Sequence, residues 1–391
     1  ARLGHEVFGT AISNTQQGWV ELAVPLSNPA DYDSSLASFT QFGDFQLRQL
    51  DGGVAVTFQS SRLFFTRVYE GETAFRGQSA ETFLSLANPG DSSATVSLLL
   101  VGGTQQEPAE FEIDPKGVLF GTISQLLGLS NVDGGYIQVE VLSGEGVAGF
   151  EAIRVGSSQT VIGLNAALGS WPANSYSAQL ASGDGVFFTS IKLINTSEFD
   201  RTVTLEAIPE GGSQIIEAGP FDLVSGQSIE LDAAELFQSP GSTELLVGSL
   251  VLRASGLGVI GDVIFGDPGD LKLAAALPLQ SRLFTEAVFG HVANSQGFFT
   301  GLAFFNPGSN PIDVDVEVYA SDGSLVGELF EPLVLSSGGR TSKTLVQLIP
   351  ESAGQAGGYI VVRSTGPLVG QELFGTSDLG LLSAVPPTIL R

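Results

Sequence analysis

Few residues in this chain could carry out chemistry, and their spacing nominates no catalytic set. His5 and His291 are the only histidines, and the chain has no cysteine and no methionine. Without thiolates or an H-E-x-x-H pattern, a zinc site is not indicated. No G-x-S-x-G segment nominates a nucleophilic serine. We therefore assign no catalytic, cofactor-binding or metal-ligating residue, and we expect a protein that is not an enzyme.

Acidic residues are the other candidates for chemistry. They cluster at Asp31 and Asp33, at Asn131 and Asp133, at Asp262, and at Asp267 and Asp270. Calcium takes several oxygens from one loop, but no D-x-[DN]-x-[DN]-G loop is present, and aspartate beside glycine or proline is ordinary turn chemistry. Glycosidic cleavage would need a cleft that joins two carboxylates. A calcium site and a hydrolase with loop-borne acids both remain alternatives.

Aromatic side chains could form a platform that stacks on sugar rings. The best candidates are Trp19, Trp171, Tyr136 and Tyr359. Tyr136 and Tyr359 recur within a Gly-Tyr-Ile segment, which favours packing in a core. Asn195-Thr196-Ser197 is the single glycosylation triplet, and it matters only where the source organism attaches glycans in this way.

The composition excludes several classes of partner. The chain has 391 residues, 43% hydrophobic and 15% charged, with a net charge of −26. Such a balance opposes nucleic acid, which is bound through Lys and Arg, and it opposes anionic membranes. No apolar run reaches the roughly 18 residues that span a bilayer. The low charge leaves apolar surface that neighbouring subunits could cover, which favours self-association.

The missing residue types also suggest a location. The sequence begins at Ala1 and contains neither Met nor Cys. A processed N-terminus, left after removal of a signal peptide, would account for the first residue. Loss of both oxidisable residue types suits a protein outside the cell. We expect an extracellular or cell-surface protein, with trimmed chain ends as the alternative explanation.

The elements that position these residues repeat along the chain. Asn88, Asn195 and Asn306 each follow a threonine by six positions, at Thr82, Thr189 and Thr300, and precede a valine by eight, at Val96, Val203 and Val314. Glycine anchors at Gly149, Gly261 and Gly370 repeat at nearly the same spacing. The spacing, near 110 residues, exceeds the roughly 20–50 of solenoids and predicts separate domains. We name residues 63–171, 172–282 and 283–391 unit 1, unit 2 and unit 3.

Within each unit the pattern predicts strands joined by tight turns. Apolar residues alternate with period two, as at Val314, Val316 and Val318, and so Asp313 and Asp315 should face solvent. About seven short strands make an immunoglobulin-like β-sandwich. One segment per unit has helical spacing instead, at 122–127, 232–237 and 342–348. We expect an all-β protein of tandem sandwiches, each with one short helix.

Residues 1–62 are interpreted as a shortened N-terminal repeat. Trp19 to Pro29 parallels Phe298 to Pro307, after which the match skips about 32 positions. Beyond the skip, 43–47 and 53–58 are aligned with 135–139 and 146–150. The joints between units are short, which predicts a stiff rod or a compact stack.

This pattern of an Asn-Pro strand, an alternating strand, a glycine turn, a short helix and a Gly-Tyr-Ile strand resembles β-sandwich repeats of secreted and cell-surface bacterial proteins. The resemblance implies a stalk or scaffold module. Our hypothesis is a non-enzymatic structural protein that polymerises into an extracellular filament or surface layer, with the shortened repeat mediating subunit contact. An adhesin or carbohydrate-binding module that recognises a glycan or cell-surface ligand is the main alternative.

Overall fold

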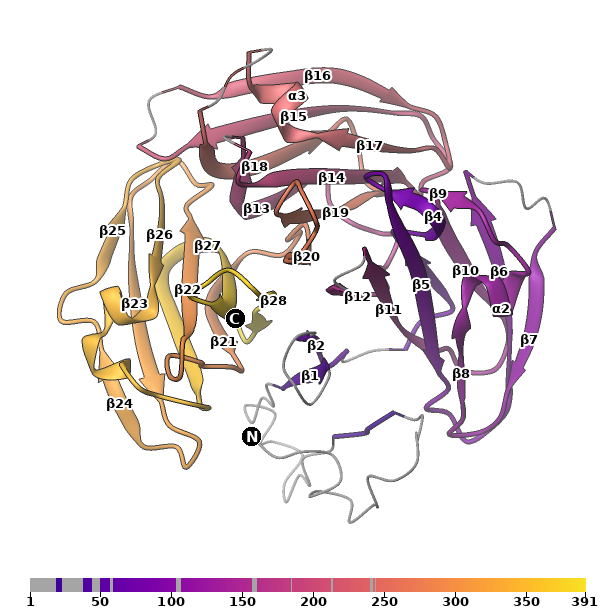
Figure 1. Cartoon of the computed structure of the whole chain (residues 1–391), viewed down its shortest axis with the longest axis horizontal. Coiled ribbons are helices and arrows are strands. Elements are labelled where there is room, and N and C mark those ends of the chain that lie inside the picture. The colour runs from indigo at the N-terminus through magenta and orange to yellow at the C-terminus, as the bar shows by residue number, and fades with distance from the viewer. Residues whose placement is uncertain are drawn as a thin grey trace.

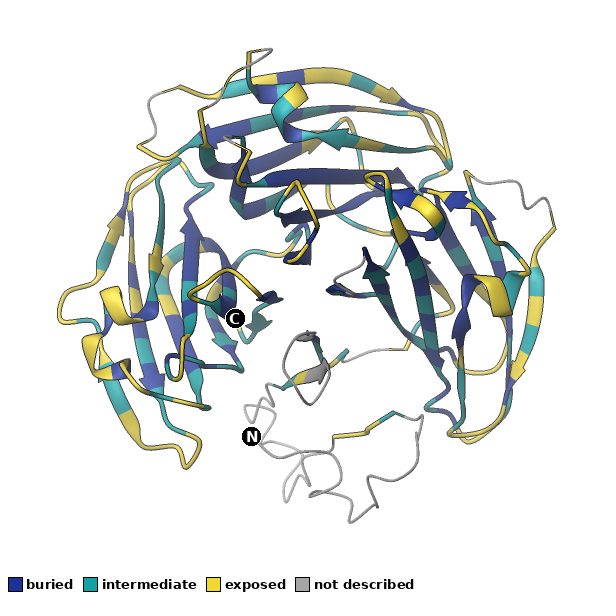
Figure 2. Ribbon diagram, in the orientation of Figure 1, coloured by how far each residue is buried: buried dark blue, intermediate teal, exposed yellow. Residues whose placement is uncertain are grey.

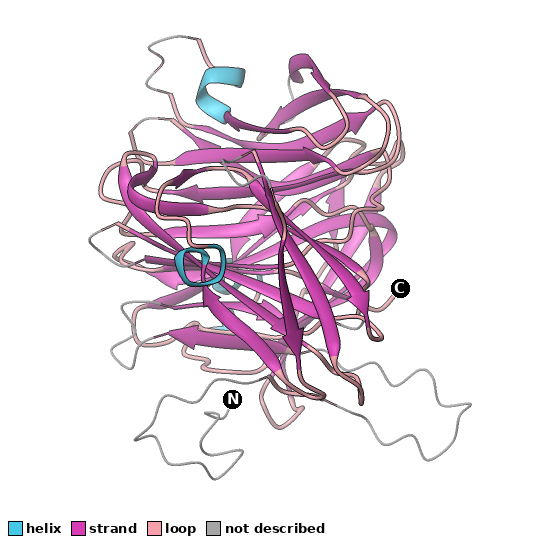
Figure 3. Cartoon of the chain, turned by 90° about the vertical axis from the view of Figure 1, so that its right-hand side faces the viewer, coloured by secondary structure: helices cyan, strands magenta, loops and turns pink. Residues whose placement is uncertain are grey.

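The fold is all-β, as expected. A computed structural model describes residues 19–22, 38–43, 50–56, 59–102, 107–156, 160–183, 185–211, 214–239, 242 and 244–391. Within these residues the chain forms several antiparallel sheets and three short α-helices (Figures 1 and 3). The expected fold class, with one short helix in each unit, is confirmed.

Unit 1 contains two sheets. The first has the strand order β3-β10-β6-β7, and the second has the order β12-β11-β5-β4-β9 with β8 added to β5. The strands are β3 (Arg62–Phe65), β4 (Tyr69–Phe75), β5 (Gln78–Ala87), β6 (Ala94–Val101), β7 (Ala109–Ile113), β8 (Val118–Thr122), β9 (Val132–Asp133), β10 (Tyr136–Ser143), β11 (Ala148–Val155) and β12 (Thr160–Asn165).

Unit 2 repeats this plan with two four-stranded sheets, ordered β13-β18-β15-β16 and β17-β14-β19-β20. The strands are β13 (Asn174–Ser182), β14 (Phe188–Asn195), β15 (Arg201–Pro209), β16 (Ile216–Leu223), β17 (Ser228–Asp232), β18 (Leu246–Ala254), β19 (Val259–Gly266) and β20 (Ala274–Pro278).

Unit 3 differs because one long strand, β27 (Tyr359–Thr376), serves both sheets. Its first half pairs with β21 and β23, and its second half pairs with β22 and β28. The other strands are β21 (Phe284–Phe289), β22 (Phe298–Phe305), β23 (Ile312–Tyr319), β24 (Leu325–Glu328), β25 (Leu333–Leu335), β26 (Arg340–Thr344), β28 (Leu382–Val385) and β29 (Thr388–Ile389).

Each unit buries its own apolar core between its two sheets. In unit 2, for example, Leu205 and Leu252 of one sheet pack with Ile191 and Val263 of the other. Alternation along the strands produces this arrangement, because successive side chains point to opposite faces. Asp313 and Asp315 are exposed on β23 while Val314 and Val316 are buried, as the alternation predicts (Figure 2).

The short helices begin where the sequence places a capping residue. They are α2 (Ile123–Leu127), α3 (Ala233–Phe237) and α4 (Leu345–Leu348), and a 3₁₀ turn η1 (Pro350–Ser352) follows α4. Thr122 forms a capping box with Gln125 at the start of α2, and the Asp232 side chain accepts from the Ala234 N–H at the start of α3. Such caps satisfy backbone N–H groups that a helix leaves without partners.

The recurring threonine and asparagine each hold a backbone turn. The hydroxyl groups of Thr82, Thr189 and Thr300 donate to the carbonyls of Tyr69, Ala181 and Ala293 and accept from the N–H groups of the same residues. The three asparagines are fully buried, and Asn306 Nδ2 donates to the carbonyls of Asn310, Leu335 and Ser336. The repeated motif is therefore structural, because it satisfies buried backbone groups.

The units are arranged around a common centre and not in a row, which corrects the expectation of a rod (Figure 1). Unit 1 lies beside unit 2 and unit 2 beside unit 3, and strands β12, β20 and β28 lie at the centre. Four strands surround the centre, because β12 contacts β2 (Leu50–Val54) and β20, and β28 contacts the same two strands. Short joints are compatible with this ring because each unit packs directly on the next.

The fourth position in the ring is taken by an N-terminal hairpin. Strands β1 (Phe39–Gly43) and β2 pair antiparallel, from Phe39 opposite Val54 to Gly43 opposite Leu50. This overturns the alignment of 53–58 with 146–150, because β2 lies with β12, β20 and β28, which follow β11, β19 and β27 in the chain. The alignment failed because it relied on matching Gly53-Val54 to Gly146-Val147, a pair too short to distinguish one strand position from another. The Asn28–Pro29 turn and His5 lie outside the described residues.

Candidate functional site

The interface between units 1 and 2 is built around Arg67, which follows β3. Its guanidinium group reaches into unit 2, where Nε donates to Asp262, Nη1 donates to Ser190 Oγ at 2.9 Å and to Glu230 at 3.0 Å, and Nη2 donates to the Ser190 carbonyl at 3.1 Å. Tyr69 Oη donates to Glu230 at 2.7 Å. The side chains of Arg67 and Asp262 are 0% and 1% exposed, and so this ion pair is closed to solvent, whereas Glu230 is 30% exposed.

The charges in this network balance. Burial lowers the pKa of Arg67, but Asp262, Tyr69 and Glu230 outweigh it and hold the pKa above its usual value. Burial raises the pKa of Glu230, and Arg67 and Lys192 then bring it below its usual range. Glu151, which is fully buried and near Asp262, has its pKa raised well above the usual value by burial and by that charge. The positively charged Arg67 and Lys192 therefore face the negatively charged Asp262 and Glu230. Glu151 is neutral, so the charges at this interface balance, which suits a rigid contact.

The equivalent interface between units 2 and 3 combines neutral amide groups with one ion pair, in which Arg340 Nη1 of unit 3 lies 3.5 Å from Glu210 of unit 2. Gln179 occupies the place of Arg67, since each lies two residues before the residue held by the recurring threonine. The Gln179 N–H donates to Gln371 Oε1 at 3.0 Å, and Arg340 Nη2 donates to Gln179 Oε1 at 3.1 Å. Asp262 and Gln371, the two partners, each directly follow a repeat glycine. Equivalent positions of the repeat therefore meet at the interface between units 1 and 2 and at the interface between units 2 and 3.

In unit 3, the position equivalent to Arg67 and Gln179 contacts the N-terminal hairpin. His291 corresponds to Arg67 and Gln179, and its ring lies edge-on to Phe39 of β1 with centroids 5.7 Å apart. The ring also lies 4.1 Å from that of Phe374. Burial lowers the pKa of His291 to about 4, and so the imidazole is neutral where it meets the hairpin. The hairpin therefore occupies the position that a fourth unit would take.

A buried carboxyl group joins the hairpin to the units on both sides. Asp51 of β2 accepts from the Gly163 N–H of unit 1 and from Ser383 Oγ of unit 3, each at 2.5 Å. Asn165 Nδ2 adds a hydrogen bond to the Val54 carbonyl at 3.0 Å. Asp51 is 1% exposed, and burial raises its pKa to about 7. This side chain therefore closes the ring between two units that are far apart in sequence.

The hairpin differs from its counterparts in one respect. Strands β11, β19 and β27 each pair on both sides, with β12 and β5, with β20 and β14, and with β28 and β22. In the part of the chain that the structure describes, β1 pairs with β2 alone. The other edge of β1 has no partner among the described residues, which makes it a candidate site for another strand.

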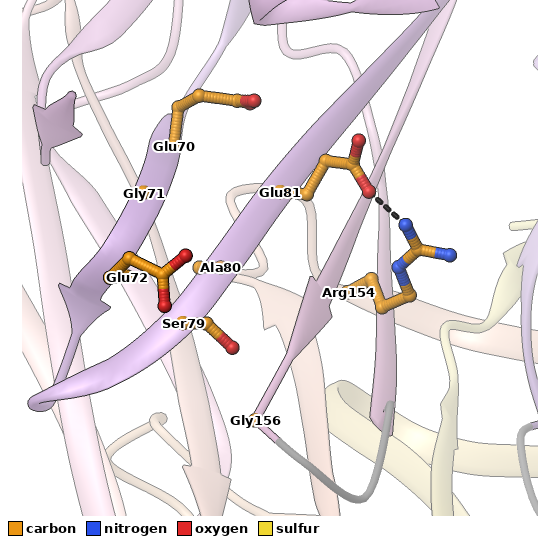
Figure 4. Close-up of a pocket in the computed structure, with 8 residues that line it drawn as sticks. All are labelled: Glu70, Gly71, Glu72, Ser79, Ala80, Glu81, Arg154 and Gly156. Atoms are coloured by element: carbon orange, nitrogen blue, oxygen red, sulfur yellow. Dashed lines mark hydrogen bonds and ion pairs between the residues drawn. The ribbon is translucent and has the colours of Figure 1, made fainter. Parts of the chain in front are cut away.

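A shallow hollow of about 250 Å³ lies on unit 1, between β4, β5 and β11 (Figure 4). Glu70 and Glu81 are directly opposite on neighbouring strands, and Arg154 is opposite Glu81 on the next and forms an ion pair with it. Burial, opposed by a hydrogen bond from Thr82 and reinforced by Glu81, raises the pKa of Glu70 to about 7. Among the described residues no three His, Cys, Asp or Glu side chains lie close enough to bind a metal.

The acids singled out in the sequence do not converge on one site. Asp262 lies on a buried strand and binds Arg67, so it is not the loop ligand that a calcium site would use. Asp267 accepts from the Leu273 N–H, and Asp270 pairs with Lys272 at the surface. Asp31 and Asp33 lie outside the described residues. Of these acids, the one with a demonstrated inter-unit role is Asp262.

The aromatic candidates divide between interfaces and surface. Tyr136 is buried, and its hydroxyl donates to the Gly226 carbonyl of unit 2 at 2.9 Å. Trp171 packs partly buried between units 1 and 2, and Trp19 Nε1 donates to the Lys116 carbonyl. Tyr359 stacks on Tyr319 at 5.0 Å on the outer sheet of unit 3, where both rings are partly exposed. Asn195 is fully buried, so its side chain is not a glycosylation acceptor in the folded chain.

Sequence reasoning did not single out Arg67, Asp51, Glu70 or Glu81. A charged residue inside an apolar strand was the available signal, as in Leu63-Phe-Phe-Thr-Arg67-Val-Tyr69. No protein-family model and no curated protein matches the chain. None of the helices in the described residues has the length and hydrophobicity that a membrane-spanning helix needs.

Proposed function

We propose that the protein is a non-enzymatic structural subunit that self-associates outside the cell, and that the N-terminal hairpin makes the contact with the next copy. The observation that carries the proposal is the edge of β1, which within the described residues pairs on one side where its three counterparts pair on both. A strand from a second copy can complete that sheet through backbone hydrogen bonds. Buried ionic and polar interfaces support the proposal, since they give the subunit a fixed shape.

A head-to-tail contact also needs a second, different surface. The outer edge of unit 3 is the best candidate, because its edge strand is split into β24 and β25, and the connection between them exposes Phe330 fully, at 98%. Val334 on β25 is 71% exposed. An apolar, solvent-exposed sheet edge is a surface on which chains associate. A contact between this edge and β1 does not close on itself, and it would extend into a filament.

Electron microscopy of concentrated protein tests the proposal. We expect filaments from the intact chain and none from Thr40→Pro, because proline removes a backbone donor from β1. Thr40→Val is the matched control, since it keeps the donor and suits a strand. Deleting residues 1–59 should also abolish filaments. If the intact chain stays monomeric at high concentration, the proposal is wrong.

A second candidate function is glycan binding, as in an adhesin. The stacked pair of Tyr319 and Tyr359 favours it, because the two rings lie nearly parallel at 7° on the outer sheet of unit 3. The Tyr319 hydroxyl donates to Glu317, and Arg363 pairs with the same carboxylate, so polar groups border the rings. A glycan array with Tyr359→Ala as the variant and Tyr176→Phe as the control tests this candidate. Binding that survives Tyr359→Ala would exclude this surface.

A further inference from the structure

The strands that pack against Asp51 carry no other titratable side chain. Asp51 lies on β2, which contacts β1, β12 and β28. The sequences Phe39–Gly43, Thr160–Asn165 and Leu382–Val385 contain no acidic, basic or histidine residue, and β20, which completes the centre, contains none either. Among the described residues, the titratable His291 contacts the hairpin through Phe39, and Glu372 Oε1 lies 3.5 Å from His291 Nδ1.

Among the described residues, the hydrogen-bond partners of Asp51 carry no charge. Ser383 donates from its hydroxyl, and Gly163 donates from its backbone. The N–H groups of Gly52 and Ala384 also stabilise the ionised carboxyl, but burial outweighs these donors. An ionised carboxylate without a cation is costly inside a protein, whereas the neutral acid can donate its proton to the Ser383 hydroxyl oxygen, 2.5 Å away.

We propose that Asp51 is a pH-sensitive latch that holds the N-terminal hairpin in the ring when it is protonated and weakens that hold when it loses its proton. The hairpin is suited to such release. In the described residues it forms a two-stranded sheet of its own that has no backbone ladder with another sheet. It is held by side chains at Asp51, Asn165 and His291, with Phe39 packed on the core of unit 3. Protonation would thus regulate the edge on which the proposed self-association depends.

The sign and range of the effect follow from linkage. The docked carboxyl has a pKa of about 7, against 3.8 for the free group, so the docked hairpin binds the proton more tightly. Docking is strongest below the free pKa and weakens about tenfold per pH unit as the pH rises from about 4 to about 7. Above about pH 7 Asp51 is ionised in both the docked and the released hairpin, and docking no longer depends on pH.

Hydrogen exchange on dilute, monomeric protein tests the latch without requiring any assembly. The readout is the protection factor of amides in Phe39–Val54 and of Gly163, each corrected for the intrinsic exchange rate at that pH, with β14 as an internal reference. We expect hairpin protection to fall roughly 50-fold between pH 5 and pH 7, as the linkage predicts. In Asp51→Asn, which keeps the shape and cannot ionise, protection should stay constant across this range.

The matched control is Asp313→Asn, because Asp313 is an exposed carboxylate on β23. It should reproduce the profile of the unmodified chain. Constant protection of the unmodified hairpin between pH 5 and pH 7 overturns the proposal, as does an Asp51→Asn profile that falls in parallel with it. If the hairpin of Asp51→Asn fails to dock at pH 5, the change in hairpin protection of the unmodified chain between pH 5 and pH 7 decides the proposal. A chain that shows the latch but forms no filaments would refute only the proposed function.

Discussion

Arg67 of unit 1 and Asp262 of unit 2 lie 195 positions apart in sequence and form an ion pair that is closed to solvent. The pair shows how the ring is held. Neither residue belongs to an apolar core cluster of its own unit, and each finds its ion-pair partner only when the two units are in register. An ionic interface therefore fixes the orientation of the units, while the apolar clusters at the same interface supply much of the contact area.

Arg67→Ala should be strongly destabilising. It leaves Asp262 and Glu230 in the interface without their principal cation, and breaking one side of a buried pair costs about 3–5 kcal/mol. Urea unfolding monitored by circular dichroism measures the loss. Arg363→Ala is the control, because Arg363 pairs with Glu286 and Glu317 at 47% side-chain exposure, and exposed pairs contribute about 1 kcal/mol or less. Equal losses in the two variants would contradict the role of Arg67.

The repeat was predictable because its signature residues act within one unit. Thr189 binds the backbone of Ala181, and Asn195 binds the carbonyls of Phe199 and Leu223, so each copy needs the same side chain at the same spacing. The alternating strands and the capped helices follow from local rules of the same kind. A pattern that serves a local purpose recurs, and recurrence is visible in one sequence.

The ring was not predictable because its interfaces use different chemistry at equivalent positions. Arg67 meets Asp262, Gln179 meets Gln371, and His291 meets Phe39. No residue type is shared by these three equivalent positions. The role of Asp51 was hidden for a further reason, since its partners in units 1 and 3 become neighbours only when the ring closes. Short joints indicated fixed units but did not indicate the direction in which the chain turns.

Asn306→Asp should destabilise unit 3 by about 2–3 kcal/mol. The amide of Asn306 donates to three backbone carbonyls, and a carboxylate would face them with no hydrogen to donate. Thermal unfolding followed by calorimetry measures the change. Asn310→Asp is the matched control, since that side chain is exposed and surface substitutions usually stay within about 0.5 kcal/mol. If both variants melt alike, the asparagine corner does not hold the turn.

Glu70→Gln should remove part of the pH dependence of stability. Burial raises the pKa of Glu70 to about 7, and so the folded chain binds this proton more tightly than the unfolded chain. The contribution of the group is then greatest below about pH 4.5 and is lost as the pH rises to about 7. The glutamine variant should therefore gain stability relative to the unmodified chain on going from pH 5 to pH 8. Denaturant midpoints at the two values measure this, with Glu72→Gln, an exposed neighbour, expected to show no such gain.

Phe330→Ser should weaken self-association without weakening the fold. Phe330 is 98% exposed in the connection between β24 and β25, so the substitution removes apolar surface from the edge of unit 3 and takes nothing from its core. Unfolding free energy should change by less than about 0.5 kcal/mol. Sedimentation velocity across a range of concentrations measures association. Leu142→Ser, at 53% exposure on β10 of unit 1, removes apolar surface elsewhere and should leave association unchanged. Equal weakening by both variants would assign association to general surface hydrophobicity and remove the unit 3 edge from the proposed contact.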